Sequence, residues 1–427
     1  MNTTTPPAAR HNLVAHIEIL DRAPIDQLRE ELADIPDHRH RRGIRHQLAD
    51  ILICVLLAKT AGATSIAAIA RWMEDNQPRL AGVGLKPCSY DTVRRVATGI
   101  DVDTLDAAAC AVAARRLRPA PGPAPGGGAG RHVVAVDGKE LTGSIGRDRR
   151  PTRLVAAMDQ HAGVVLAQGQ VAAKGGEQGA LPALLSRIDR PGGFVVTGDA
   201  GFNGAPSRKA ITQAGGSWVL AVKGNQSNAL TALETSDWDD RPVGFHAKES
   251  GHGRKSEVWV KRIAYPDPKA APITGATCAI QVRRVTERPN SDSAKNGKHR
   301  PKTKPKQSSR IERTTRRGKT YNTAEELVYI LTSIPDGQVD CEELYKLNRE
   351  HWLIENKLHA VRDMTLSEDA SQIRTGNAPR FMAIFNNLLI SLIRVKEGIN
   401  ANIKAATRKA ASNLSYTLCL LALPKLE

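Results

Sequence analysis

A stretch of prolines and glycines, RPAPGPAPGGGAG from Arg118 to Gly130, divides this chain into two parts with different patterns. Its proline-rich half is stiff and its glycine-rich half is flexible, so it has the composition of a linker between domains. Apolar residues before it recur at helical spacing, whereas short strand-like runs begin directly after it. We therefore predict an all-helical domain over residues 1–117, a linker over 118–130 and a sheet-based domain beyond.

The segments after the linker predict an α/β fold with a definite order of elements. Three short apolar runs separated by turn residues predict antiparallel strands: HVVAV, TRLVAAMD and GVVLAQGQV. The next four runs predict a helix, a strand, a helix and a strand: GALPALLSRI, GGFVVTGDAGF, APSRKAITQAG and SWVLAVKGNQ. This is the element order of a ribonuclease-H-like core, a mixed sheet with flanking helices, and we assign its first part to residues 131–226.

The remainder of the chain predicts an insertion followed by the end of the core. Residues 227–320 contain the strand-like runs SEVWVKRIAY and CAIQVRRV, so we expect a β-rich insertion there. Within it, Lys295 to Lys319 holds eleven Lys or Arg residues and one acidic residue, Glu312. No core forms from that composition, and we predict a flexible basic loop that touches phosphates. Residues 321–427 then complete the core with one strand and several helices.

The charge of the chain indicates a polyanionic partner. It carries 61 Lys and Arg against 44 Asp and Glu among 427 residues, a net charge of +17. A folded chain this basic usually binds nucleic acid, although the charge can also serve solubility alone.

We expect no membrane span and a reducing compartment. The most apolar stretch, LADILICVLLAKTAGA, is too short to cross a bilayer and predicts a buried helix. The first residues show no apolar run of a signal peptide, and the six cysteines form no CxxC pair. A cytoplasmic location follows as the expectation.

Two short helices in the N-terminal region resemble a helix-turn-helix DNA reader. Ser65 is placed to cap a helix through IAAIARWMED, and Ser89 to cap a second helix through YDTVRRVATG. In that arrangement Arg94 and Arg95 would face the duplex. The alternative is an ordinary helical bundle with a solvated basic face.

Two acidic residues stand at the ends of apolar runs that suit buried strands. Asp137 follows VVAV and Asp199 follows FVVTG. For an isolated Asp-Gly pair the simpler interpretation is a hairpin turn. The alternative is that each strand holds a metal-binding or catalytic carboxylate at its tip.

A third carboxylate, Glu355, lies on a predicted helix from Cys341 to Met364. One face of this helix is an apolar stripe, made of Leu347, Ile354, Leu358 and Val361. A polar stripe lies beside it, made of Asn348, His351, Glu355 and Arg362. A carboxylate at such a margin needs a base or a metal as its partner. Three converging carboxylates suit Mg²⁺ or Mn²⁺, and two such ions can act on a phosphodiester.

The chain resembles the ISAs-type insertion-sequence transposases, which are part of the DDE superfamily. The resemblance is carried by blocks that recur in order between about Asp34 and Arg394: HRRGIRHQLADILICVLLAKTAGATSIAAIARW, VVAVDGKEL, GDAGFN, AVKGNQ, GHGR and REHWLIENKLHAVRDMTLSEDASQIRTGNAPR. It implies a ribonuclease-H-like fold, two-metal phosphodiester chemistry and an insertion before the Glu-bearing helix. It also implies a bacterial, nucleoid-associated protein.

The resemblance assigns roles residue by residue. Asp137, Asp199 and Glu355 take the three acidic positions, both catalytic and metal-binding. Related transposases often place an Arg one turn before the Glu and a Lys two turns after it. His351 and Arg362 stand at those places here, and Arg349 is an alternative phosphate contact.

Several further residues are open to two interpretations. Lys223 and Asn225 would contact DNA or form a structural turn. Trp352 would stack on a flipped base or pack in the core. Glu368 and Asp369 compete for the third acidic role, but a cap or a supporting role suits them better, and Asp159 suits a hairpin turn.

The expected function is a DNA transposase that hydrolyses the phosphodiester at each transposon end, using two Mg²⁺ or Mn²⁺ ions. The freed 3′-hydroxyl would then attack target DNA. The expected partner is double-stranded DNA, bound by a homodimer or higher oligomer. Two alternatives stay open: a DNA-binding protein or repressor without catalysis, and a metal-dependent nuclease without strand transfer.

Overall fold

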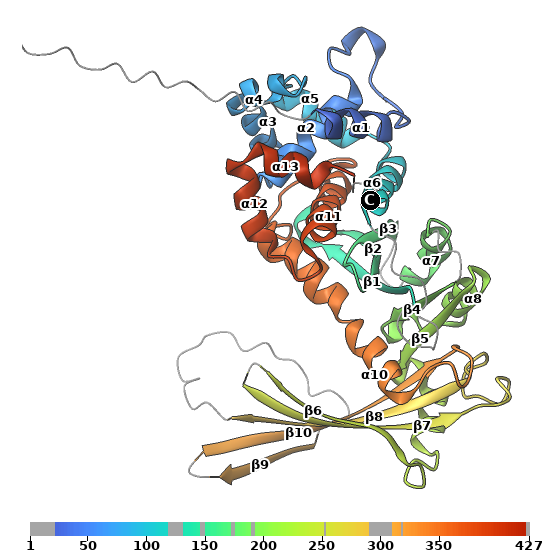
Figure 1. Ribbon diagram of the computed structural model, residues 1–427. Coiled ribbons are helices and arrows are strands. Elements are labelled where there is room, and N and C mark those ends of the chain that lie inside the picture. The colour runs from blue at the N-terminus through green and yellow to red at the C-terminus, as the bar shows by residue number, and fades with distance from the viewer. Residues whose placement is uncertain are drawn as a thin grey trace, which may run out of the picture.

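The structure of the protein is a computed structural model (Figure 1). The structure describes residues 22–117, 131–145, 150–171, 176–188, 193–251, 253–289, 310–316 and 319–423. The predicted linker, 118–130, and the first part of the predicted basic loop, 295–309, lie outside the described residues.

The N-terminal region is helical, as its apolar spacing predicts. Its helices are α1 Ala23–Glu31, α2 Leu48–Thr60, α3 Ile66–Asp75, α4 Gln77–Gly82, α5 Tyr90–Gly99 and α6 Val102–Arg116, with a short 3₁₀ turn η1 at Arg41–Gly43. Both predicted caps are confirmed: Ser65 accepts a hydrogen bond from the Ala68 amide, and Ser89 from the Thr92 amide. The apolar stretch forms α2, which is buried along most of its length.

The core sheet has the ribonuclease-H-like arrangement. Its elements are β1 Val133–Leu141, β2 Thr152–Asp159, β3 Val165–Val171, α7 Glu177–Leu185, β4 Phe194–Gly198, α8 Ala205–Gln213 and β5 Gly216–Val222. The strands lie in the order β3-β2-β1-β4-β5. β1 pairs antiparallel with β2 and parallel with β4, and β4 pairs parallel with β5. The predicted order of elements is therefore confirmed.

The alternation of side chains along β1 decides which residues face the site. Val134 and Val136 pack in one cluster with Leu181 of α7, whereas Ala135 packs with Ile354 and Leu358 on the opposite face. Because side chains alternate along a strand, Asp137 and Lys139 share the face of Ala135. They therefore point toward the helix that carries Glu355.

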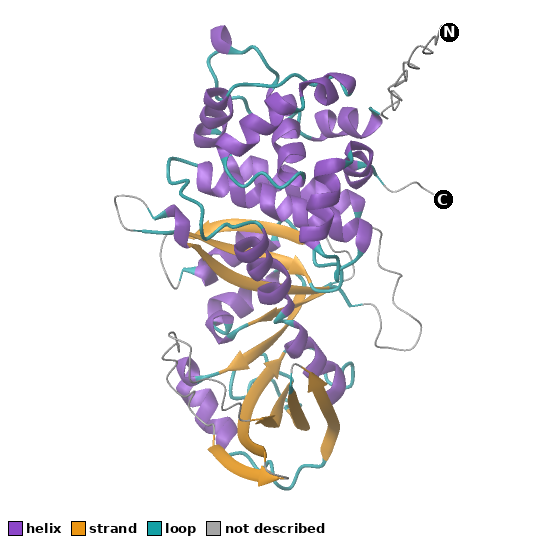
Figure 2. Ribbon diagram, turned by 90° about the vertical axis from the view of Figure 1, so that its left-hand side faces the viewer, coloured by secondary structure: helices purple, strands orange, loops and turns teal. Residues whose placement is uncertain are grey.

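Helices from both ends of the chain cover the core (Figure 2). The C-terminal helices are α11 Ala378–Glu397, α12 Ile403–Ser412 and α13 Leu414–Leu421. α11 contacts α2, α5, α6 and β3, so the N-terminal helices pack directly against the core. α11 has the length and composition of a membrane span, but 89% of its apolar window is buried inside the protein. It is the central helix of the fold.

The insertion extends the core sheet instead of forming a separate one. It comprises α9 Ser227–Glu234, β6 Val243–Gly251, β7 Arg254–Ala264, β8 Cys278–Pro289 and β9 Arg310–Arg316. The long strand β10, Lys319–Thr332, pairs with β5 on one side and β8 on the other. It also pairs with β9, so the prediction of a flexible loop is wrong for residues 310–316. Backbone pairing with β10 orders this part despite its charge.

The predicted helix from Cys341 to Met364 is not one regular α-helix. The α-helix α10 covers only Cys341–Glu350, and two π-helical segments follow: η6 Ile354–His359 and η7 Val361–Thr365. A π-turn takes more residues than an α-turn because its hydrogen bonds span five residues. Positions counted at α-helical spacing beyond Glu355 therefore fall on the wrong face.

Candidate active site

Asp137 lies in the middle of β1, so the prediction that its strand ends there is wrong. Residues 138–141 continue the strand and pair with β2, from Gly138 opposite Val155 to Leu141 opposite Thr152. Only the parallel partner stops here, since the last residues paired between β1 and β4 are Val136 and Gly198. Asp137 directly follows Val136 on β1, and Asp199 directly follows Gly198 on β4. The register places the two aspartates side by side at the edge where the parallel strands part.

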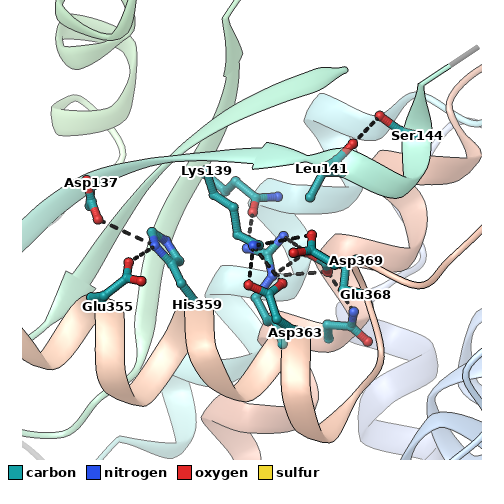
Figure 3. Close-up of polar contacts among 12 residues, drawn as sticks. Asp137, Lys139, Leu141, Ser144, Glu355, His359, Asp363, Glu368 and Asp369 are labelled. Atoms are coloured by element: carbon teal, nitrogen blue, oxygen red, sulfur yellow. Dashed lines mark hydrogen bonds and ion pairs between the residues drawn. The ribbon is translucent and has the colours of Figure 1, made fainter. Parts of the chain in front are cut away.

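Glu355 and His359 approach Asp137 from η6, as Figure 3 shows. The Nδ1 atom of His359 lies 3.1 Å from Glu355 Oε2 and 3.4 Å from Asp137 Oδ2. One ligand atom from each of these three residues lies within 4.8 Å of the other two. The site therefore offers two oxygen donors and one nitrogen donor to a single cation.

The carboxylate of Glu355 and the imidazole of His359 shift each other's pKa. Burial alone would lower the pKa of His359, but hydrogen bonds to Asp137 and Glu355 raise it above its ordinary value. The hydrogen bond from His359 in turn lowers the pKa of Glu355, against a smaller opposing effect of burial. The two carboxylates therefore favour positive charge at the position of the His359 ring.

Asp199 does not join this group of three ligand atoms. It is exposed, and its Oδ1 atom accepts a hydrogen bond of 2.7 Å from the Gly201 amide. It nevertheless lines the same cavity as Asp137 and Glu355. Its charge also acts on His351, whose pKa is lowered by burial while Asp137 and Asp199 oppose that shift.

The prediction that Arg362 contacts DNA is wrong. Its side chain is fully buried, and it forms a hydrogen-bonded ion pair with Glu368 at 2.7 Å. Glu368 is also buried and accepts a hydrogen bond from Asn386. The π-helical backbone turns position 362 away from the face of Glu355 and into the core.

Lys139 ties β1 to the same helix. Its Nζ atom lies 2.6 Å from Asp363 and 3.8 Å from Asp369. The side chain of Lys139 is largely buried, so this ion pair is shielded from solvent. Asp369 thus helps to hold the helix beside β1, whereas Glu368 pairs with Arg362 in the core, so both have the supporting role expected of them.

The remaining predicted residues fall into two groups. Lys223, Arg349, His351 and Trp352 line one cavity of about 820 Å³ together with the three acids. Asn225 instead donates a hydrogen bond to the Ala200 carbonyl, which is the structural-turn interpretation. Trp352 is 54% exposed, so the core-packing interpretation is wrong.

The insertion forms the opposite wall of this cavity. Alternate residues of two neighbouring strands face it: Arg254 and Ser256 on β7, and Arg284, Thr286 and Arg288 on β8. Ser256 is paired with Thr286 in the sheet register, and their hydroxyl oxygens lie 2.9 Å apart. Arginines thus face the acids across the hollow.

In the N-terminal region, Arg94 and Arg95 are both exposed on α5, as expected. Arg94 lies 3.7 Å from Asp91, and the Arg95 Nε atom donates to the Asp91 carbonyl. The additional helix α4 lies between α3 and α5 in the chain. The helix-turn-helix interpretation stays a prediction.

The fold and the site define a ribonuclease-H-like enzyme with an acidic cluster suited to a divalent cation. A family model described as "Transposase DDE domain" matches residues 128–392, and one described as "DDE_Tnp_1-associated" matches residues 29–112. The chain belongs to the DDE transposase family and is a DNA transposase of the insertion-sequence type.

Two relatives in sequence carry the name of a putative transposase. The chain is 26% identical to "Putative transposase YncI" of Escherichia coli O157:H7, over 93% of this chain and 95% of that protein. It is 24% identical to "H repeat-associated putative transposase YhhI" of E. coli K12, over 93% and 98% respectively. A cryo-EM structure of a piggyBac transposase synaptic complex with hairpin DNA is similar with a TM-score of 0.40 and 13% identity, covering 94% of this chain and 79% of that chain.

Two features of the site were missed in the sequence. His359 lies four residues after Glu355, a spacing that brings side chains together on a helix, and this was the available signal. Lys139 lies two residues after Asp137, so strand alternation puts both on one face. Neither spacing alone shows that His359 contacts Asp137 or that Lys139 contacts Asp363.

Proposed function

We propose that Asp137, Asp199 and Glu355 hold the divalent cations with which this transposase hydrolyses DNA at the transposon ends and transfers the freed strand to target DNA. The observation that carries the proposal is the group formed by Asp137, Glu355 and His359, whose ligand atoms lie within 4.8 Å of one another. Asp137 and Glu355 line a cavity that Lys223 and four arginines also line. Carboxylate oxygens are the ligands that Mg²⁺ and Mn²⁺ prefer.

The donor set fits such a cation. Asp137 is half-buried and Glu355 is exposed, so both remain open to the cavity while β1 and η6 fix their backbones. The other ring nitrogen of His359, Nε2, is buried without a hydrogen-bond partner among the described residues. The ring is therefore directed by Nδ1 alone, which faces the two carboxylates. Asp199 follows the strand next to Asp137 and supports a second ion.

When bound, divalent cations would activate an attacking oxygen and stabilise the leaving oxygen of a phosphodiester. The chain's own residues position the DNA around them. Lys223 and Arg349 are exposed on the core side of the cavity, and Arg254 and Arg288 are exposed on the insertion side. These four basic side chains would neutralise phosphates that flank the scissile bond. Trp352 offers a ring face on which a base can stack.

A single assay separates this proposal from its alternatives. The full chain is incubated with Mg²⁺, a DNA carrying the transposon end labelled at its 3′ strand, and an unlabelled circular target. The proposal predicts cleavage at the end and then covalent transfer of the label to the target, and both are lost in EDTA. A nuclease would cut without transfer, and a repressor would bind the end without cutting.

The proposed reaction also requires a particular oligomeric state on DNA. Two transposon ends must be joined to one target, so we propose a homodimer or higher oligomer on DNA at the bacterial nucleoid. Light scattering of the chain with and without end DNA measures this. A complex that stays one chain per DNA end, even during strand transfer, would contradict it.

A further inference from the structure

A second hollow, lined by arginines and by no carboxylate among the described residues, lies in the N-terminal helical region. Its volume is about 820 Å³. Seven residues of the segment His38–His46, all but Arg41 and Ile44, form one wall, and the region of α5 forms the other with Ser89, Thr92, Arg95 and Thr98. Figures 1 and 2 place the N-terminal helices and the insertion sheet at opposite ends of the molecule. The hollow is therefore a separate surface from the catalytic cavity.

Specific contacts hold the segment 38–46 in place. Arg39 is paired with Asp37 and also donates to the His46 carbonyl. The His40 ring accepts a hydrogen bond from the Arg42 amide, which caps η1. The His38 ring packs against α5 at Gly99, where a Cβ atom would lie 2.5 Å from His38 Nε2. These contacts use the side chains of His38, Arg39 and His40, and leave the side chains of Arg42 and Arg45 out of them.

The arginines that face the hollow are not used by the fold. Arg42 and Arg45 are exposed and line it, and no carboxylate contacts either of them in the part of the chain that the structure describes. Arg95 is also exposed, and its Nε atom donates to the Asp91 carbonyl while no carboxylate among the described residues pairs with it. Three guanidinium groups therefore converge without a compensating acid.

The chemistry of this hollow suits phosphodiester groups. Guanidinium groups bind phosphate oxygens through paired N–H donors. The amino-terminal end of α5, a helix of 10 residues, carries the Ser89 and Thr92 hydroxyls beside them. Backbone amides and hydroxyls at a helix start are common phosphate contacts. Cations on two facing walls suit a chain of phosphates better than one small anion.

We propose that the groove between residues 38–46 and α5 binds the sugar–phosphate backbone of duplex DNA. The inference rests on the proposed function, since it gives the transposase a second place to hold the DNA that it cuts. Contacts to phosphates carry no base information, so this groove would add affinity and register without sequence preference. Arg42, Arg45 and Arg95 supply the charge, and Gly99 lets the segment approach α5.

Binding of the full chain to labelled duplexes, measured by fluorescence anisotropy in EDTA, tests the groove without any cutting. One duplex carries the transposon end and the other is unrelated. The triple variant Arg42→Gln/Arg45→Gln/Arg95→Gln should lose at least about tenfold in affinity for both at 0.1 M salt. The slope of log K against log salt should become less steep by about 2 to 3.

A matched control removes the same charge from the same region. Arg41, Arg71 and Arg79 are exposed but do not line the groove, so Arg41→Gln/Arg71→Gln/Arg79→Gln should bind nearly as the parent does. Equal losses in the two triple variants would show general attraction and overturn the proposal. A loss confined to the transposon end would overturn it as well, because base reading would then be responsible.

A charge-neutral variant tests the geometry. Gly99→Ala should displace His38 and the segment behind it, and lower affinity for both duplexes with no change in net charge. Unchanged binding would overturn the role given to the segment. The groove and the catalytic assignment can fail separately. Binding in EDTA tests the groove alone, whereas DNA cutting by an Asp137→Asn variant would overturn the catalytic assignment without changing that binding.

Discussion

Two charged clusters lie next to each other between β1 and the Glu-bearing helix, and they differ in how their charge is compensated (Figure 3). In the first, Asp137 and Glu355 share one imidazole and remain open to a cavity. In the second, Arg362 is matched by Glu368 in the core. The first cluster has two acids and one weak base, so it lacks positive charge. The second has its charges matched.

This difference in compensation distinguishes a carboxylate that can bind a metal from one that stabilises the fold. Burial alone would raise the pKa of Glu368, but Arg362 and Asn386 hold it below its usual value. That carboxylate is ionised and fully engaged, so it has no capacity left for a metal. Glu355 keeps its second oxygen for a new ligand. Two acids 13 positions apart in one segment thus have opposite roles.

Removing a carboxylate from the open cluster should give the largest functional effect. Asp137→Asn should reduce DNA cleavage in Mg²⁺ by at least about 10³-fold, because the site loses charge that holds the cation. Stability should change little, since the asparagine oxygen can still accept the hydrogen bond from the Gly138 amide. Single-turnover cleavage and urea unfolding, measured side by side, check both halves. Cleavage at the parent rate would contradict the assignment.

Breaking the matched pair should act on stability instead. Arg362→Met leaves Glu368 charged and buried, which should lower the free energy of unfolding by about 3–5 kcal/mol. The double variant Arg362→Met/Glu368→Leu should recover most of that loss, because neither charge remains to be compensated. Urea unfolding curves measure both. A double variant as unstable as the single one would show that the pair is not the cause.

His359 belongs to the open cluster but should have a smaller effect than Asp137. His359→Gln should weaken Mn²⁺ binding about 10- to 100-fold, since one donor or its orienting hydrogen bond is removed. Calorimetric titration of Mn²⁺ into the full chain without DNA measures this. His161→Gln is the matched control, because that ring contacts only the Arg131 carbonyl among the described residues. Equal affinities for the two variants would exclude His359 from the site.

Lys59 should give the smallest effect and a distinctive pH dependence. Burial lowers its pKa from 10.5 to about 8, against attraction from Glu368. Between pH 8 and 10.5 the unfolded chain then binds more protons, so the stability of the parent rises with pH across that window. Lys59→Met should be more stable at pH 7 by about 1–2 kcal/mol. Unfolding at pH 7 and pH 10 should show this gain shrinking as pH rises, and a constant difference would contradict it.

Local patterns in the sequence predicted much of the fold. The strand and helix order follows from apolar spacing, and Ser65 and Ser89 cap their helices because an N-cap needs only a few adjacent residues. The convergence of Asp137 and Glu355 was also predictable, since each lies beside a buried run. These features depend on neighbours in the chain.

The errors arose where distant pairing or an unusual backbone decides the outcome. Asp137-Gly138 is not a turn because β2 pairs with the residues beyond it. Residues 310–316 are ordered because β10 lies beside them. Arg362 faces the core because the helix becomes π-helical after α10, which no spacing of apolar residues indicated. Asp199 stands outside the three-residue group because its carboxylate turns to the Gly201 amide.

The most direct measurement is a structure of the full chain soaked with Mn²⁺, with the metal located by its anomalous scattering. We expect an anomalous peak within about 2.5 Å of carboxylate oxygens of both Asp137 and Glu355. A second peak beside Asp199 would extend the site to two ions. Peaks only at other acids, or none at saturating Mn²⁺ with these carboxylates still paired to His359, would contradict the assignment.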